Sequence, residues 1–84
     1  MPSAYAGDVR KLAQEVAKAL VDYPEEVEVY AEQEGDTLVL ELSVAESDLG
    51  RVIGKSGRTA RALRTLLSAA AAKTHKRCSL EILE

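Results

Sequence analysis

The chain has 84 residues, of which 46% are apolar and 30% are charged, and its formal net charge is −3. A chain of this length builds one small core, so we expect a single domain over residues 1–84 and no separate cofactor domain. Its one cysteine and one histidine exclude an internal disulfide, a metal centre with spaced ligands and a nucleophile with its own base, so we expect no enzyme, no cofactor, no metal and no small-molecule substrate.

The N-terminal part of the chain contains one amphipathic segment. Residues 1–7 are expected to be loosely ordered, and they lack the basic start and apolar run of a signal peptide. Apolar side chains recur at helical spacing over residues 9–20. Asp8 is available as the N-cap and Pro24 lies beyond the end, so we expect a helix over residues 8–21. No apolar stretch reaches the ~20 residues needed to span a bilayer, which predicts a cytoplasmic protein without a membrane partner.

Two strands with one apolar face each are predicted after the first helix. Apolar and polar side chains alternate over residues 27–32 and again over residues 38–42, which is the period of a strand with one solvent-exposed face. Residues 34–36 read Glu-Gly-Asp and supply a turn, so the two strands are expected to pair as an antiparallel hairpin. The apolar positions are Val27, Val29, Ala31, Leu38, Leu40 and Leu42.

The C-terminal half is predicted to form two helices and a third strand. Residues 46–53 fit a short helix, with Asp48 near its positive N-terminal end. After the glycine that ends it, an apolar stripe predicts a second helix over residues 58–73, with Ser56 placed to cap it. Alternation over residues 77–82 indicates the last strand. The stripe comprises Ala60, Leu63, Leu66, Leu67, Ala70 and Ala71.

The order of these elements, αββααβ, predicts an α+β fold. Three strands with one apolar face each and three amphipathic helices pack most economically as a two-layer sandwich, in which a three-stranded mixed sheet is covered on one face by the three helices. The last two strands are linked by a crossover that contains both later helices, so we expect them to run parallel.

The loop between the two later helices is the most distinctive motif of the chain. It reads Ile53-Gly54-Lys55-Ser56-Gly57-Arg58. Glycines lack a Cβ and let the backbone approach a phosphodiester chain closely, while a lysine and the start of the next helix supply positive potential. Charge is divided along the chain in the same sense, because residues 1–49 hold 3 basic and 12 acidic side chains and residues 50–84 hold 8 basic and 2 acidic ones. The basic half is therefore expected to face phosphates.

With this order of elements, residues 49–59 resemble the core motif of a type II KH domain, and nearly the whole chain resembles the small single-domain bacterial KH proteins of the KhpA family. The resemblance implies a single-stranded RNA-binding module that acts as an RNA chaperone or post-transcriptional regulator. It also implies a partner, either a second copy in a homodimer or a larger KH-containing protein in a heterodimer. Because no aromatic residue lies near the loop, we expect modest affinity and low base selectivity.

The resemblance further implies a role for each residue of the site. The two glycines frame a clamp on the RNA backbone, Lys55 pairs with a phosphate, and Ser56 donates a hydrogen bond or caps the next helix. Val52 and Ile53 help to floor an apolar groove for the bases, and the neighbouring arginines contact the RNA backbone. Arg61 and Arg64 extend this basic track if their helix face turns toward the RNA. The expected RNA-binding residues are Gly54, Lys55, Ser56, Gly57, Arg51, Val52, Ile53, Arg58 and Arg61.

Three other interpretations of the same residues stay open at the level of sequence. Gly50 followed by Gly54-Lys55-Ser56 nearly matches the phosphate loop of nucleotide hydrolases, but only three residues separate the glycines where four are required, and no buried strand is expected before them. Gly54 and Gly57 could simply turn the chain between two packed helices, with Lys55 as a solvated cation. The domain could also serve mainly to dimerise or to dock a larger RNA-binding partner, through its alanine-rich helix or its acidic hairpin.

Overall fold

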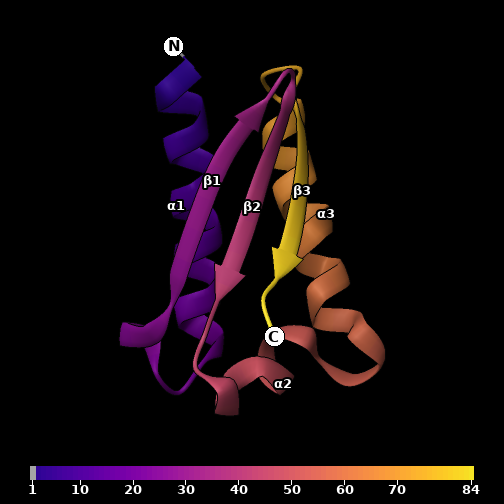
Figure 1. Cartoon of the computed structure of the whole chain (residues 1–84). Helices are drawn as coiled ribbons and strands as arrows, with labels where there is room; N and C mark the ends of the chain where they lie inside the picture. Colours follow the sequence, from indigo (N-terminus) through magenta and orange to yellow (C-terminus); the bar gives the residue numbers. More distant parts are fainter. Residues whose placement is uncertain (1) are drawn as a thin grey trace.

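The computed structural model describes the backbone of residues 2–84 and the side chains of residues 8–84. Its helices and strands follow in the order αββααβ, as the sequence predicts (Figure 1). They are α1 (Pro2–Leu20), β1 (Glu28–Glu34), β2 (Thr37–Ser43), α2 (Leu49–Ile53), α3 (Arg58–Ala72) and β3 (Arg77–Ile82). Short 3₁₀ turns lie between them at Pro24–Glu26 (η1), Glu46–Asp48 (η2) and Lys55–Gly57 (η3).

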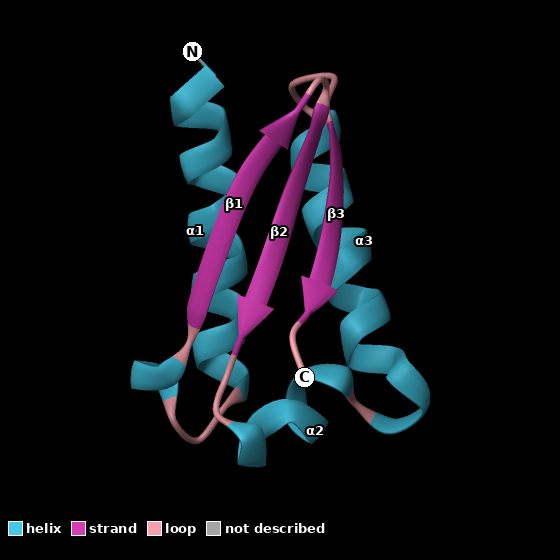
Figure 2. Cartoon of the chain, in the orientation of Figure 1, coloured by secondary structure: helices cyan, strands magenta, loops and turns pink. Residues whose placement is uncertain are grey.

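The three strands form one mixed sheet in the order β1-β2-β3 (Figure 2). β1 and β2 pair antiparallel around a two-residue turn, with Glu34 opposite Thr37, and Gly35 in the turn has a φ of 63°. Glycine adopts that left-handed conformation without steric cost, which suits a tight hairpin. β2 and β3 pair parallel, beginning with Thr37 beside Arg77. Both the predicted hairpin and the predicted parallel pair are confirmed.

The helices form the second layer of the sandwich. α1 and α3 run behind the sheet, α1 against β1 and α3 against β3, while the short α2 joins this layer at the end where β2 leaves the sheet (Figure 1). The opposite face of the sheet has no described element over it and carries polar side chains such as Glu32 and Glu81. The core between the layers comprises Val9, Ala13, Ala17, Val27, Val29, Leu38, Leu40, Leu42, Val52, Leu63, Leu67 and Leu80.

α1 begins at Pro2, ahead of the expected start at Asp8. Proline lacks the N–H that has no partner in the first turn, and its fixed φ suits a helix, so a helix can begin there without a cap at Asp8. The expectation that Asp8 caps this helix is therefore wrong. Met1 and the side chains of residues 2–7 lie outside the described part of the chain, so the expected loose order of residues 1–7 stays a prediction.

α3 buries a narrower stripe than the sequence predicts. Its fully buried side chains are Ala60, Leu63, Leu67 and Ala71, whereas Leu66 is 42% exposed. Adjacent residues are turned by about 100° around an α-helix, so Leu66 and Leu67 do not both face the sheet. Leu66 lies instead on the solvent-exposed outer side of α3, and its assignment to the core stripe was wrong.

Candidate nucleic-acid interface

The two-glycine loop links α2 to α3 at the end of the molecule where α2 closes the helix layer (Figure 2). At its start the Gly54 N–H donates to the carbonyl oxygen of Gly50 at 2.8 Å, and at its end the Gly57 N–H donates to the carbonyl oxygen of Gly54 at 3.1 Å. Lys55 and Ser56, between the glycines, are exposed. The loop is therefore a tight turn with a cationic tip in solvent.

Gly54 is required both by its conformation and by its neighbours. Its backbone has φ 79° and ψ 168°, a region that glycine alone populates readily. A Cβ at this position would lie 2.8 Å from the backbone nitrogen of Thr59 and would overlap the Thr59 side chain. Thr59 thus packs against bare main chain, and this contact fixes the course of the loop.

Gly57 is required by its conformation alone. Its φ of 74° and ψ of 14° are left-handed, but a Cβ there would meet no atom within 4 Å. Ser56 before it is also left-handed, with φ 57° and ψ 26°. The open space beside Gly57 leaves its backbone accessible to a bulky ligand such as a phosphodiester chain.

Ser56 does not cap α3, and this part of its expected role is wrong. The N-cap of α3 is Gly57, and no side chain makes a capping hydrogen bond there. Ser56 lies one residue too early in the chain for the role, and its left-handed backbone belongs to the turn rather than to the extended conformation of a usual N-cap. Its hydroxyl is left at the exposed tip beside Lys55.

A groove of about 330 Å³ lies beside the loop, between α3 and the end of β3. Its apolar lining residues are buried or half-buried, and its charged lining residues are exposed, so the groove has an apolar floor and a charged rim. The floor consists of Ile53, Ala60 and Ile82, and the rim of Arg61, Arg64 and Glu84. Gly57 closes the groove at the loop.

The arginines of α3 are distributed over two sides of that helix. Arg61 and Arg64 both line the groove, so the side of α3 that carries Arg64 does turn toward it. The Arg64 Nε also donates to the carbonyl oxygen of Leu80 at 3.3 Å, which ties α3 to the edge strand β3. Arg58 lines a different hollow, on the outer side of α3, which Arg61 shares.

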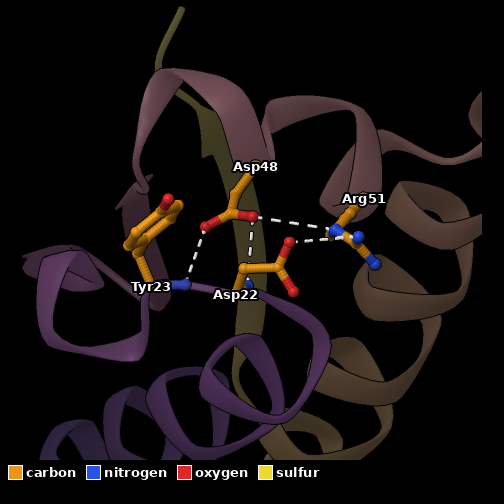
Figure 3. Close-up of polar contacts among 4 residues, drawn as sticks. All are labelled: Asp22, Tyr23, Asp48 and Arg51. Carbon is orange, nitrogen blue, oxygen red and sulfur yellow. Dashed lines mark hydrogen bonds and ion pairs between the residues drawn. The ribbon is translucent and has the colours of Figure 1, made fainter.

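Two further residues that the sequence assigns to the site lie apart from the groove. Val52 has no exposed surface and belongs to the core beneath the loop, so it supports the site from below. Arg51 is 56% exposed, but its guanidinium is already paired (Figure 3). Its Nη2 lies 3.1 Å from Oδ2 of Asp22, and its Nε lies 3.7 Å from Oδ1 of Asp48.

Asp48 is the structural residue that sequence reasoning missed. It lies at the N-terminal end of α2, as expected, but it makes no capping bond there, because its carboxylate points toward the end of α1. There it accepts hydrogen bonds from the backbone N–H of Asp22 at 3.1 Å and of Tyr23 at 3.0 Å. An aspartate just before a helix is the ordinary signal of an N-terminus, so nothing in the sequence indicates this long-range contact.

The remaining reactive side chains do not form a second centre within the part of the chain that the structure describes. No group of three or more His, Cys, Asp or Glu residues there could hold a metal ion. Cys78 is half-buried in β3, and burial raises the pKa of its thiol, which favours the protonated form at neutral pH. Among the described helices, none is long and apolar enough to cross a membrane.

Comparison with known proteins shows to which family the chain belongs. A family model described as "KhpA/KhpB, KH domain" matches residues 10–82, a range that contains the whole sheet and the two-glycine loop. The chain belongs to this KH-domain family. The resemblance to KhpA proteins and the α+β fold of a KH domain are therefore confirmed.

Curated relatives agree with the family model over most of their length. "RNA-binding protein KhpA" of Halalkalibacterium halodurans is 46% identical over 76 residues, which cover 90% of this chain and 100% of that protein. The protein of the same name from Clostridium acetobutylicum is 47% identical over 75 residues, or 89% of this chain and 100% of that protein. The one from Chlamydia pneumoniae is 51% identical over 69 residues, or 82% and 88% of the two chains.

Proposed function

We propose that this KH domain binds single-stranded RNA through the Gly54–Gly57 loop and the groove beside it. The observation that carries the proposal is the position of the loop, an exposed turn of bare main chain with a lysine at its tip. It lies directly at the end of a groove with an apolar floor and a rim of two arginines and one glutamate. The names of the relatives, each an "RNA-binding protein KhpA", support it.

The geometry suggests how the two parts of an RNA strand are divided. Phosphates lie against the loop, where Gly57 leaves its backbone open and Lys55 supplies charge. Bases enter the groove and contact Ile53 and Ile82, while Arg61 on the rim pairs with a phosphate. Base-paired strands hold their bases in a stack and cannot place them in this groove, so the domain prefers unpaired RNA.

Affinity and base selectivity of one domain are expected to be modest. The chain has no phenylalanine or tryptophan, and its three tyrosines all precede β2, far in sequence from the loop. Stacking of bases on aromatic rings, which adds about 1–3 kcal/mol per base in other single-strand binders, is therefore missing from the groove. A domain of this kind suits an RNA chaperone or post-transcriptional regulator in the cytoplasm, which binds many transcripts weakly.

A partner is part of the proposal, and the outer side of α3 is the surface that fits one. A hollow of about 610 Å³ there is lined mainly by small and apolar side chains, with Leu66 the large exposed one. Its lining residues are Arg58, Arg61, Ala62, Thr65, Leu66 and Ala69. A second copy, or a larger KH-containing protein, packed on this face would bring two loops onto one RNA strand and raise the effective concentration of the second contact.

The same exposed leucine supports the alternative function. If association through Leu66 is the main role, the domain is an adapter that docks a larger RNA-binding partner, and its own loop contributes little. The two functions differ in what a change in the loop does, because an adapter keeps its partner and its effect when the loop no longer binds RNA.

The double variant Lys55→Asp/Ser56→Asp tests the proposed function. It places two carboxylates where phosphate should lie, on an exposed tip that makes no core contact, so we expect RNA binding to be lost and thermal unfolding to be unchanged. The measurement is fluorescence anisotropy with a labelled single-stranded oligonucleotide. A matched control, Lys73→Asp/Ser68→Asp, makes the same change in net charge at exposed positions in the last part of α3 and directly after it, and should bind nearly normally. Unaltered affinity in the folded loop variant would refute the clamp.

A further inference from the structure

The corner where α1, η2 and α2 meet contains the one buried charged side chain in the described part of the molecule. Asp48 is 1% exposed, and its carboxylate accepts the two backbone N–H groups of residues 22 and 23, directly after α1 (Figure 3). A buried carboxylate is costly unless its oxygens have donors, and here each oxygen receives one main-chain N–H. These two directional hydrogen bonds therefore fix one specific arrangement of the segments that meet at this corner.

The element that this corner holds is the one that ends in the RNA loop. α2 has only five residues, which is too short to be stable without contacts to its surroundings. Asp48 immediately precedes it, and Gly54 closes its last turn by a hydrogen bond to Gly50. The direction in which the loop leaves the domain thus depends on how the start of α2 is fixed to α1.

Arg51 completes the corner from the side of α2. Its guanidinium lies between the carboxylates of Asp22 and Asp48, so it neutralises the buried charge and ties α2 to the segment after α1 (Figure 3). A phosphate would have to displace Asp22 to reach the same nitrogen atom. This arrangement gives Arg51 a task that does not involve RNA.

We propose that Asp48 is a positioning residue for the RNA loop and that Arg51 acts with it in this corner rather than as a contact to phosphate. The proposal rests on the proposed RNA-binding function and specifies which residues hold the site in place. It predicts that a change at Asp48 alters the conformation of the loop, which lies at the opposite end of α2. RNA binding should then weaken in protein that is still folded.

The first test compares Asp48→Asn with Asp22→Asn. Asparagine keeps the size of Asp48 but offers one acceptor oxygen to two N–H donors, whereas Asp22→Asn removes only the exposed ion pair with Arg51. Below the unfolding temperature of each variant, we expect the amide resonances of residues 54–57 to shift in Asp48→Asn and to stay in place in Asp22→Asn. RNA affinity should fall at least about fivefold in the first variant and less than twofold in the second.

The second test separates a corner role for Arg51 from a phosphate contact, and it decides the proposal even if Asp48→Asn does not fold. The slope of log affinity against log salt concentration is negative. For a single strand, each lost phosphate contact makes this slope less steep by about 0.7. We expect Lys55→Gln to make the slope less steep by about that amount. Arg51→Gln should weaken binding while the slope stays at the wild-type value.

The outcomes assign failure to one proposal or to the other. The positioning role would be overturned if Arg51→Gln and Lys55→Gln made the salt slope less steep by the same amount. It would also be overturned if Asp48→Asn left both the loop amide resonances and the RNA affinity unaltered. If the unmodified protein binds no single-stranded RNA even at low salt, the proposed function fails, while the amide resonances of the loop still decide whether Asp48 positions it.

Discussion

At the scale of single residues, the two glycines of the loop are needed for different reasons. Gly54 lies in a backbone region reserved for glycine and packs against Thr59, whereas Gly57 is merely left-handed in open space. The first therefore determines the shape of the loop, and the second determines how closely a ligand can approach. A sequence comparison that treats the two as equivalent would miss this division.

This difference predicts unequal costs for alanine at the two positions. Gly54→Ala adds both a forbidden backbone conformation and an overlap with Thr59, so we expect the free energy of unfolding to fall by at least about 2 kcal/mol. Gly57→Ala adds only the left-handed penalty, about 1–2 kcal/mol. Urea denaturation of both variants measures the two losses. Equal losses, or a larger one for Gly57→Ala, would contradict the different roles assigned to the two glycines.

At the scale of elements, α3 presents two adjacent leucines to different environments. Leu67 is 1% exposed in the core, and Leu66 lies on the outer side of the helix. Leu67→Ala should lower the free energy of unfolding by about 2–5 kcal/mol, because it leaves a cavity in the core. Leu66→Ala should change it by less than about 0.5 kcal/mol. Thermal or chemical denaturation distinguishes them, and a large loss at Leu66 would show that this face is covered within the monomer.

The outer side of α3 also predicts an effect on association. Leu66→Asp places a charge in the middle of the proposed partner surface without touching the core, so we expect a folded protein that sediments as a monomer at concentrations where the unmodified chain is expected to dimerise. Leu83→Asp is the matched control, because Leu83 is 41% exposed but does not line the hollow on α3. Dimers that persist in Leu66→Asp would place the partner surface elsewhere.

Elements and their order could be predicted from the sequence because they depend on local periodicity. Alternation fixed the three leucines of β2 on the inner face, and the crossover between the last two strands required their parallel pairing. The absence of a cap at Ser56 and the contacts of Asp48 could not be predicted. Both depend on where a backbone or a distant N–H lies in space, and one residue of displacement, as at Ser56, removes the bond.

The candidate site was predicted better in its loop than in its surroundings. Motif and charge located the glycines and Lys55, because bare backbone and a cation have few other uses between two helices. Ile82, the last residue of β3, and Glu84, which follows that strand, complete the groove. They became part of the site only through the parallel pairing of β3. Periodicity along the chain does not predict that residues so far apart in sequence come together.

At the scale of the whole molecule, positive charge collects around the loop and α3, whereas the uncovered face of the sheet carries glutamates of all three strands. Such a dipolar protein can orient an approaching polyanion toward the loop and repel it elsewhere. The cations beside the proposed RNA path are few, namely Lys55 in the loop and Arg61 and Arg64 on the rim of the groove. Binding should therefore be sensitive to salt, but only moderately.

We expect the slope of log affinity against log salt concentration to be about −2 for an oligonucleotide of about four nucleotides, which occupies one domain. An oligonucleotide long enough to reach both loops of a dimer should give about twice that slope. Anisotropy titrations between about 50 and 200 mM salt measure both values. A slope near zero would exclude phosphate contacts as the source of affinity, and tight binding of a duplex of the same sequence would exclude the groove.

The parallel pairing of β2 with β3 has a consequence for the order of folding during synthesis. β3 forms one wall of the proposed RNA groove, yet it is synthesised after the other described elements, because α2, the loop and α3 are all translated between the two paired strands. The hairpin and the first helix can meet early, but the middle strand keeps a bare edge until the last segment arrives. A nascent chain therefore exposes its glycine turn before the groove beside it exists, and the proposed binding of RNA must await the synthesis of β3.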